Sequence, residues 1–232
     1  GTEVAHAPDR RRTRFGPAPP AAAVLDLVRH VLATAAPAVR APASAREWAQ
    51  LWEDVPPTAL PWHTEILEPA LTAALGTGQG RHLLDLGTGA GTVAIAAARA
   101  GYVVTATDVA PAALAVARQR AGDLVILFAL DDVTRSALTG GFDVVADRGV
   151  LHGLPPSMWP AYAATVTRLV ADGGRLLLIA HTATGARGTR PVDEATVAAL
   201  LPGFVLGETT ALVLAGGDAR LYTLVRRASV TS

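Results

Sequence analysis

A glycine-rich turn directly after a short apolar run is the first place where this sequence could do chemistry. The run Leu83–Leu86 ends in Gly87, Gly89 and Gly91, and the helix formers of Val93–Ala100 follow at once. Glycine adopts positive φ at little cost and lets the backbone approach a ligand closely. The pattern predicts a strand, a tight loop and a helix that bind the phosphate or nucleoside part of a ligand.

Two acidic residues frame this turn. Asp108 ends the next apolar run, 21 residues after Gly87, where a carboxylate can accept hydrogen bonds from both ribose hydroxyls of a nucleoside. Asp85 lies just before the turn and can either pin it or hold an ammonium group through water. This spacing fits an NAD site or an S-adenosylmethionine site. Thr92 argues against NAD, because the dinucleotide fingerprint has Gly or Ala at that position.

A second group of polar residues follows the predicted strand 143–146. Open α/β sheets bind ligands beyond the carboxyl ends of their strands, which is where Asp147 and His152 belong. His152 is our first candidate for a general base, because a neutral imidazole can take a proton near pH 7. The alternative is a structural histidine that orients the following loop. Asp147 could position an acceptor molecule or a cofactor ammonium, or it could cap the loop amides.

The elements that position these residues alternate between strand and helix from His82 onward. Such alternation predicts right-handed βαβ units and a largely parallel sheet with helices on both faces. The Gly-Gly-Asp connection at 216–218 predicts that the last two strands form an antiparallel hairpin, which dinucleotide folds do not usually have. The predicted strands are 82–86, 103–107, 124–128, 143–146, 175–180, 204–214 and 220–226. The predicted helices are 91–100, 111–121, 133–138, 157–171 and 192–201.

The first third of the chain has a different pattern, without strand-like alternation. We expect a disordered tail at 1–19, a helical N-terminal cap at 20–78 and the ligand-binding domain at 79–232. The arginines of the tail indicate a solvated segment or an arm that touches RNA or a membrane. Helices are expected at 21–35, after Ser44 with Glu47 as a capping box, and at 64–75. Trp48 and Trp52 lie one turn apart on the second helix, and we expect both in the core.

The composition excludes several kinds of site. There is no cysteine, and all 20 basic residues are arginine, so disulfides, thiolate metal ligands and lysine Schiff bases are excluded. The net charge is zero, which gives no indication of a nucleic-acid partner. The six histidines are scattered, so no metal site is expected. We expect a cytoplasmic bacterial protein, a monomer or homodimer, with neither a membrane nor a nucleic acid as partner.

Residues 82–227 resemble a class I S-adenosylmethionine-dependent methyltransferase. Leu84–Gly91 is similar to the first motif of that family, 142–149 to its fourth-strand motif, and 173–176 to the turn into its fifth strand. The resemblance implies a Rossmann-like α/β fold with a seven-stranded sheet in the order 3-2-1-4-5-7-6, in which strand 7 is antiparallel. It also implies S-adenosylmethionine as the cofactor.

The resemblance further implies which residues contact the cofactor. The family places an acid and a backbone amide around the adenine at 131–133. We favour Asp132 with Val133 there, because an Asp before a small apolar residue is the usual form. The other residues expected at the cofactor are Asp85, Gly87, Thr88, Gly89, Asp108 and Val109.

A weaker resemblance concerns the cap. Residues 48–53 and 60–63 look like a stretch of the thiopurine and halide methyltransferase branch, which implies that Trp62 lies over the methionine end of the cofactor. His63, Arg148 and His181 are expected to contact the substrate. For His63 and His181 an exposed or capping position is the alternative.

Taken together, these features predict methyl transfer to an O, N or S atom of a small molecule, in bacterial secondary metabolism. An alternative is a methyltransferase fold that keeps the cofactor for a structural purpose and catalyses a cyclisation or rearrangement. Two further alternatives are an NAD-dependent oxidoreductase and a nucleic-acid methyltransferase with the Arg-rich tail as its arm.

Overall fold

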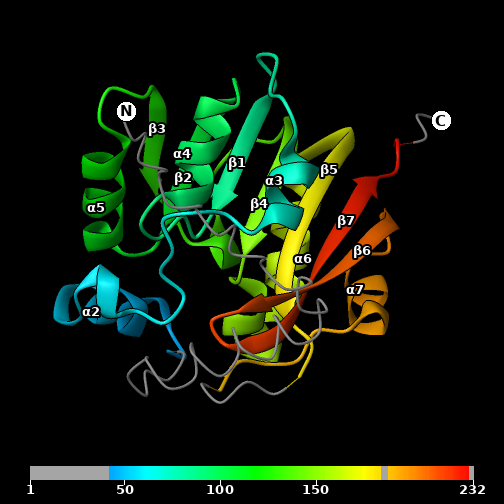
Figure 1. Ribbon diagram of the computed structural model, residues 1–232. Coiled ribbons are helices and arrows are strands. Elements are labelled where there is room, and N and C mark those ends of the chain that lie inside the picture. The colour runs from blue at the N-terminus through cyan, green and yellow to red at the C-terminus, as the bar shows by residue number, and fades with distance from the viewer. Residues whose placement is uncertain (1–41, 184–187, 230–232) are drawn as a thin grey trace, which may run out of the picture.

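A seven-stranded sheet forms the centre of the protein (Figure 1), and its strand order is β3-β2-β1-β4-β5-β7-β6. The computed structural model describes residues 42–183 and 188–229, so the expected tail at 1–19 and helix at 21–35 lie outside the described residues. The strands β1 to β5 run parallel, and β7 is antiparallel to both β5 and β6. The predicted order and the antiparallel seventh strand are confirmed. The strands are β1 (His82–Leu86), β2 (Val103–Asp108), β3 (Ile126–Leu130), β4 (Phe142–Arg148), β5 (Val170–His181), β6 (Phe204–Leu214) and β7 (Gly217–Arg226).

Helices cover both faces of this sheet, and the sequence of the central strands shows why. Leu83 and Leu84 are both fully buried, yet they belong to different apolar clusters because neighbouring side chains of a strand point to opposite faces. One cluster includes side chains of α3 and α4, and the other includes side chains of α6 and α7. Strands that are buried on both faces read as continuous apolar runs. The helices are α2 (Ala45–Asp54), α3 (Pro69–Leu75), α4 (Thr92–Arg99), α5 (Pro111–Ala121), α6 (Trp159–Leu169) and α7 (Glu194–Leu200).

Several expected boundaries were wrong. The helix expected at 64–75 begins only at Pro69, because the hydroxyl of Thr64 bonds to the backbone of Ile66 and holds an irregular segment. The helix expected at 157–171 is a 3-10 turn, Pro156–Met158, followed by α6. The fifth strand begins at Val170, which pairs with Phe142 of β4, rather than at 175.

Helix α2 of the predicted cap begins as its sequence indicates. The Ser44 hydroxyl accepts a hydrogen bond from the Glu47 N–H at 3.2 Å. The Glu47 carboxylate accepts one from the N–H of Ala43, at 2.7 Å, instead of the N–H of Ser44 that a capping box would use. The helix packs against α5, where Trp52 forms a small cluster with Ala110 and Ala113. The cap segment therefore lies next to the loop that follows β2.

A bidentate ion pair joins the cap to the central sheet. The Arg148 guanidinium, at the end of β4, donates from Nε to both carboxylate oxygens of Glu68 at 3.0 Å, and from Nη2 to Oε1 at 2.6 Å. Its Nη1 donates to the backbone carbonyl of Trp62 at 3.1 Å. The side chains of the pair are only 13% and 14% exposed. The end of β4 thus holds both the start of α3 and the backbone of Trp62.

We predict that Arg148→Gln lowers the free energy of unfolding by about 3–5 kcal/mol, because it leaves the Glu68 charge nearly buried without its partner. Arg220→Gln is the matched control, since the Arg220–Glu194 pair is 40% and 52% exposed. The control should lose less than about 1 kcal/mol. Urea unfolding of both variants measures the difference, and equal losses would contradict the proposed anchoring.

Candidate active site

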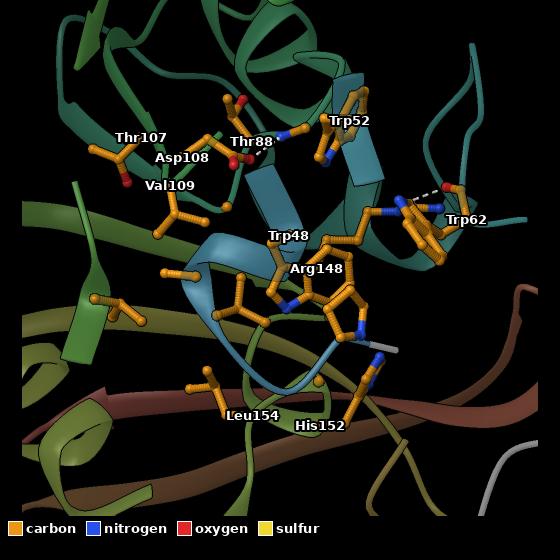
Figure 2. A pocket seen from close by; sticks show the side chains of 18 of the residues that line it. Trp48, Trp52, Trp62, Thr88, Thr107, Asp108, Val109, Arg148, His152 and Leu154 are labelled. Atoms are coloured by element: carbon orange, nitrogen blue, oxygen red, sulfur yellow. Dashed lines mark hydrogen bonds between the residues drawn. The ribbon is translucent and has the colours of Figure 1, made fainter. Parts of the chain in front are cut away.

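One cavity lies beyond the carboxyl ends of β1, β2 and β4, next to α2 and the segment 62–64 (Figure 2). We call its two parts the nucleoside half and the acceptor half. The nucleoside half is lined by Asp85, Gly87, Gly89, Asp108, Val109 and Asp131. The acceptor half is lined by Trp48, Trp62, His152, Leu154, Met158 and Leu214. The two halves are continuous, so a ligand in one can touch a ligand in the other.

The glycine turn packs closely between the loop after β4 and helix α2. Gly87 has φ +59°, and a Cβ there would lie 2.3 Å from Cγ2 of Val150 in the loop after β4. Gly89 has φ +54°, and its Cβ would lie 3.2 Å from the Trp52 ring of the cap. Both positions therefore need glycine, for its conformation and for space.

Asp108 holds this turn through its carboxylate. Its Oδ2 accepts a hydrogen bond from the Gly89 N–H at 2.9 Å, drawn in Figure 2, and its Oδ1 accepts one from the Ala110 N–H at 2.9 Å. Burial raises the pKa of Asp108, and these amide bonds act in the opposite direction. The turn and the end of β2 are thus fixed relative to each other, with Val109 on the cavity wall between them.

Asp85 pins the other side of the turn. Its Oδ2 accepts hydrogen bonds from the Thr88 hydroxyl at 2.6 Å and from the Ala94 N–H at 3.1 Å. Burial raises the pKa of Asp85 to about 7, and the charges of Asp108 and Asp147 add to this rise. Asp85 is therefore a carboxyl group whose charge can change near neutral pH.

The two aspartates after β3 have different surroundings. Asp132 accepts hydrogen bonds from the N–H and the hydroxyl of Thr134 and from Arg135 Nε, so it caps the 3-10 turn Val133–Arg135. Asp131 lines the cavity with a buried Oδ2 that has no hydrogen-bond partner among the described residues. Asp132 lines the cavity as well, so our preference for it stays a prediction, but its carboxylate is already held by Thr134 and Arg135. Thr134, two residues after Asp132, is a turn signal that could have revealed this.

Asp147 is a structural residue, which corrects the expectation of a catalytic one. Its Oδ1 accepts hydrogen bonds from the N–H groups of Gly149 and Val150, and its Oδ2 accepts from the Leu151 N–H and the Tyr162 hydroxyl. Burial raises its pKa. With four donors around it, this carboxylate shapes the loop after β4 and has no capacity left for a ligand.

Arg148 and His181 line the cavity, but their polar groups are committed to the protein. The Arg148 guanidinium holds Glu68 and the Trp62 carbonyl, as described above. The ring of His181 bonds to the Thr189 hydroxyl at 2.8 Å and to the Leu214 carbonyl at 2.9 Å. Both residues lie on the cavity wall, so their contact with a substrate stays a prediction, although their polar groups bind other parts of the protein.

His152 is buried beside His181 and does not have the properties of a base. Its Nδ1 accepts a hydrogen bond from the backbone N–H of His181 at 3.0 Å, and the two rings stack with centroids 4.3 Å apart and an interplanar angle of 1°. Burial, with the nearby His181 and Arg148, lowers the pKa of His152 to about 3. The expectation of a general base at this position is therefore corrected.

The tryptophans of the cap form a wall of the cavity. Trp48 meets Trp62 edge to face, with ring centroids 5.4 Å apart, and both line the acceptor half (Figure 2). Trp52 is buried against the Gly89 turn. The expectation that Trp48 belongs to the core was thus wrong, because the helix turns this residue toward the cavity.

The ring of His63, on the cavity wall, keeps one nitrogen without a partner among the described residues. Its Nε2 bonds to Glu65 at 3.0 Å, and Glu65 is held by Arg120 at 2.6 Å. Its Nδ1 is buried and has no hydrogen-bond partner among the described residues. Contact between His63 and a ligand stays a prediction.

A model of the methyltransferase domain family matches residues 83–174. This match covers β1 to the start of β5, including the glycine turn, Asp108 and the loop after β4. The chain contains a class I S-adenosylmethionine-dependent methyltransferase domain. Among residues 42–183 and 188–229, no group of three or more His, Asp or Glu side chains could hold a metal ion.

Known proteins resemble this methyltransferase domain in sequence and in fold. The ubiquinone biosynthesis O-methyltransferase of Alkalilimnicola ehrlichii is 35% identical over 107 residues, which are 44% of this chain and 42% of that protein. The chain spans about half, or less, of the length of the curated relatives it matches.

Among solved structures, one concerns the conversion of a disulfide bond into a thioacetal group during echinomycin biosynthesis. It has a TM-score of 0.67 and 21% identity, and covers 79% of this chain and 93% of that one. Magnesium protoporphyrin IX methyltransferase from Synechocystis with bound S-adenosylmethionine has a TM-score of 0.63 and 19% identity, covering 78% and 96%. These similarities establish the fold of the methyltransferase domain.

We predict that Asp147→Asn lowers the free energy of unfolding by about 1–3 kcal/mol, because an amide cannot accept all four hydrogen bonds. Tyr162→Phe should cost a similar amount, since it removes one buried donor. Asp143→Asn, at a half-buried carboxylate that accepts one N–H, from His82, is the control. Denaturant unfolding measures all three, and an Asp147→Asn protein of wild-type stability would contradict the structural role.

Proposed function

We propose that the protein transfers a methyl group from S-adenosylmethionine to an O, N or S atom of a small molecule. The observation that carries this proposal is the continuity of the nucleoside half and the acceptor half in one cavity under the cap. Such continuity is what a reaction between a bound cofactor and a second ligand requires.

The residues of the nucleoside half fit this cofactor. Asp131 presents a buried carboxylate oxygen without a partner, which suits the amino group of an adenine. Asp108 stands at the end of β2, where a carboxylate can bind ribose hydroxyls. The Gly87–Gly89 turn allows close approach of the backbone, and Asp85 provides a carboxylate toward the ammonium group. When bound, S-adenosylmethionine supplies a methyl group that its sulfonium charge already activates.

The chain's own contribution is then to position and shield the acceptor. Trp48 and Trp62 form an apolar wall, and the Arg148–Glu68 ion pair keeps this wall in place. Reactants held in the right orientation react much faster than free ones, and exclusion of water strengthens the electrostatic interactions around them.

A small-molecule acceptor is favoured over a nucleic acid. The cap covers the cavity, and the net charge of the chain is zero, whereas nucleic-acid enzymes carry basic patches. The similar proteins named above include methyltransferases of ubiquinone biosynthesis and of magnesium protoporphyrin IX. In the described residues no helix has the length and apolar character needed to cross a membrane. A bacterial secondary pathway, a cytoplasmic location and a monomeric or homodimeric state remain predictions from the sequence.

Calorimetric titration with S-adenosylmethionine tests the proposal. Binding to the wild type is expected, and Asp108→Ala should weaken it by about 1–3 kcal/mol through lost hydrogen bonds to the charged group. NADH, added in a parallel titration, should not bind. A wild-type protein that binds no S-adenosylmethionine refutes the proposal, and product without S-adenosylhomocysteine would favour the structural use of the cofactor.

Asp131 and Asp132 provide a matched pair for the adenine site. Asp131→Asn should weaken the binding of S-adenosylhomocysteine by about 1–3 kcal/mol, because a buried carboxylate acceptor is replaced. Asp132→Asn should change affinity by less than about 0.5 kcal/mol, because the Asp132 carboxylate is already engaged by Thr134 and Arg135. Calorimetry measures both variants; a larger loss in Asp132→Asn would support our first preference.

The affinity for S-adenosylmethionine should rise with pH up to about 7. Burial raises the pKa of Asp85 to about 7, so the carboxyl is largely protonated below that value. The ammonium group of the cofactor favours the ionised form, lowers this pKa and thereby releases a proton on binding. Calorimetry at pH 6 and 8, in buffers of different ionisation enthalpy, measures the number of protons released on binding. Asp85→Asn should bind weakly with no pH dependence, and a wild type without proton release would contradict the assignment.

A further inference from the structure

Hydrogen bonds fix the protons on the stacked histidines of the acceptor half. The Leu214 carbonyl can only accept, so Nε2 of His181 carries a proton and its Nδ1 accepts from the Thr189 hydroxyl. The backbone N–H of His181 can only donate, so Nδ1 of His152 carries none. A neutral His152 therefore has its proton on Nε2.

The protonated edge of His152 belongs to the cavity wall. Its ring lines the acceptor half, and in Figure 2 it extends toward the part of the cavity that Trp48 encloses. A Cβ at Gly149 would lie 3.2 Å from Nε2 and Cε1 of this ring. The glycine thus gives the imidazole edge its space, with φ +106° at that position.

We propose that His152 recognises the methyl acceptor as a fixed hydrogen-bond donor, through Nε2–H, and that this acceptor is a largely apolar molecule with one electron-rich heteroatom. This inference rests on the proposed methyl transfer and specifies the acceptor for the same cavity. The apolar character follows from the walls formed by Trp48, Trp62, Leu154 and Met158. The heteroatom follows from the donor, because no acceptor atom of the described residues bonds to Nε2 of His152, which leaves its N–H for a ligand in the cavity.

The surroundings of His152 keep it a donor over a wide pH range. A second proton would have to enter at Nδ1, where the backbone N–H of His181 already points. The charged and titratable groups that face the ring are His181 of β5 and Arg148 of β4, and both disfavour the imidazolium, as does burial. His152 therefore selects an acceptor rather than deprotonating it.

A fixed donor of this kind discriminates strongly. A site built to hydrogen-bond a ligand atom rejects the analogue that lacks this atom, because the buried protein group is left unpaired. An arenethiolate carries a sulfur atom that can accept a hydrogen bond from Nε2–H, and an arene of similar shape lacks such an atom. We choose thiophenol, which is largely ionised at pH 7.5, and toluene as the two probes.

The first experiment uses 15N-histidine NMR of the full chain with bound S-adenosylhomocysteine. His152 should show a protonated Nε2 and an unprotonated Nδ1, without change from pH 5.5 to 8. His82→Gln, at the opposite end of β1 from the cavity, serves as the assignment control. A proton on Nδ1, or titration of His152 in this range, overturns the proposal.

The second experiment adds the probes to the same complex. Thiophenol should shift the Nε2 resonance of His152 and bind at least tenfold more tightly than toluene. His152→Gln, which keeps an N–H donor, should retain part of this preference, and His152→Leu should lose it. An Nε2 resonance that thiophenol leaves unmoved, or equal affinity for the probes, overturns the inference. Failure of S-adenosylhomocysteine to bind at the outset would instead refute the proposed function.

Discussion

Three buried carboxylates at the carboxyl ends of the central strands determine the shape of the site. Asp85, Asp108 and Asp147 end or nearly end β1, β2 and β4. Asp85 accepts hydrogen bonds from the Thr88 hydroxyl and the N–H of Ala94 in α4. Asp108 accepts them from the N–H groups of Gly89 and Ala110, and Asp147 from three N–H groups of the loop after β4. A buried charge without such partners would be very unfavourable. Because the loops must supply the donors, they are fixed in position, and the glycine turn, the Val150 contact and the cavity follow from that requirement.

Much of the fold could be predicted from local pattern. The apolar run of β1 and the Pro111 start of α5 coincide with the expected bounds, because both depend on neighbouring residues. The strand order came from the family resemblance. The early start of β5 could not be foreseen, since Val170 joins the strand through pairing with Phe142, a distant residue.

For the candidate site too, local motifs could be predicted from the sequence, and contacts between remote residues could not. The glycine turn with Asp85 and Asp108 is a local motif, and the structure brings these residues together on one cavity wall. The hydrogen-bond partners of Arg148 and His181 could not be foreseen because they are remote: Glu68 lies 80 residues before Arg148, and Leu214 lies 33 residues after His181. No spacing rule links such pairs. Only the folded chain shows that these polar groups are already used.

In this cavity, burial places the pKa of an aspartate, Asp85, above that of a histidine, His152, which is the reverse of their order in water. At neutral pH the carboxyl group of Asp85 is close to its pKa of about 7, whereas the imidazole of His152, with a pKa of about 3, is uncharged. An aspartate here has the titration range that histidine has in water. Acidification of the surrounding medium would therefore neutralise Asp85 in the nucleoside half well before it adds a proton to His152 in the acceptor half.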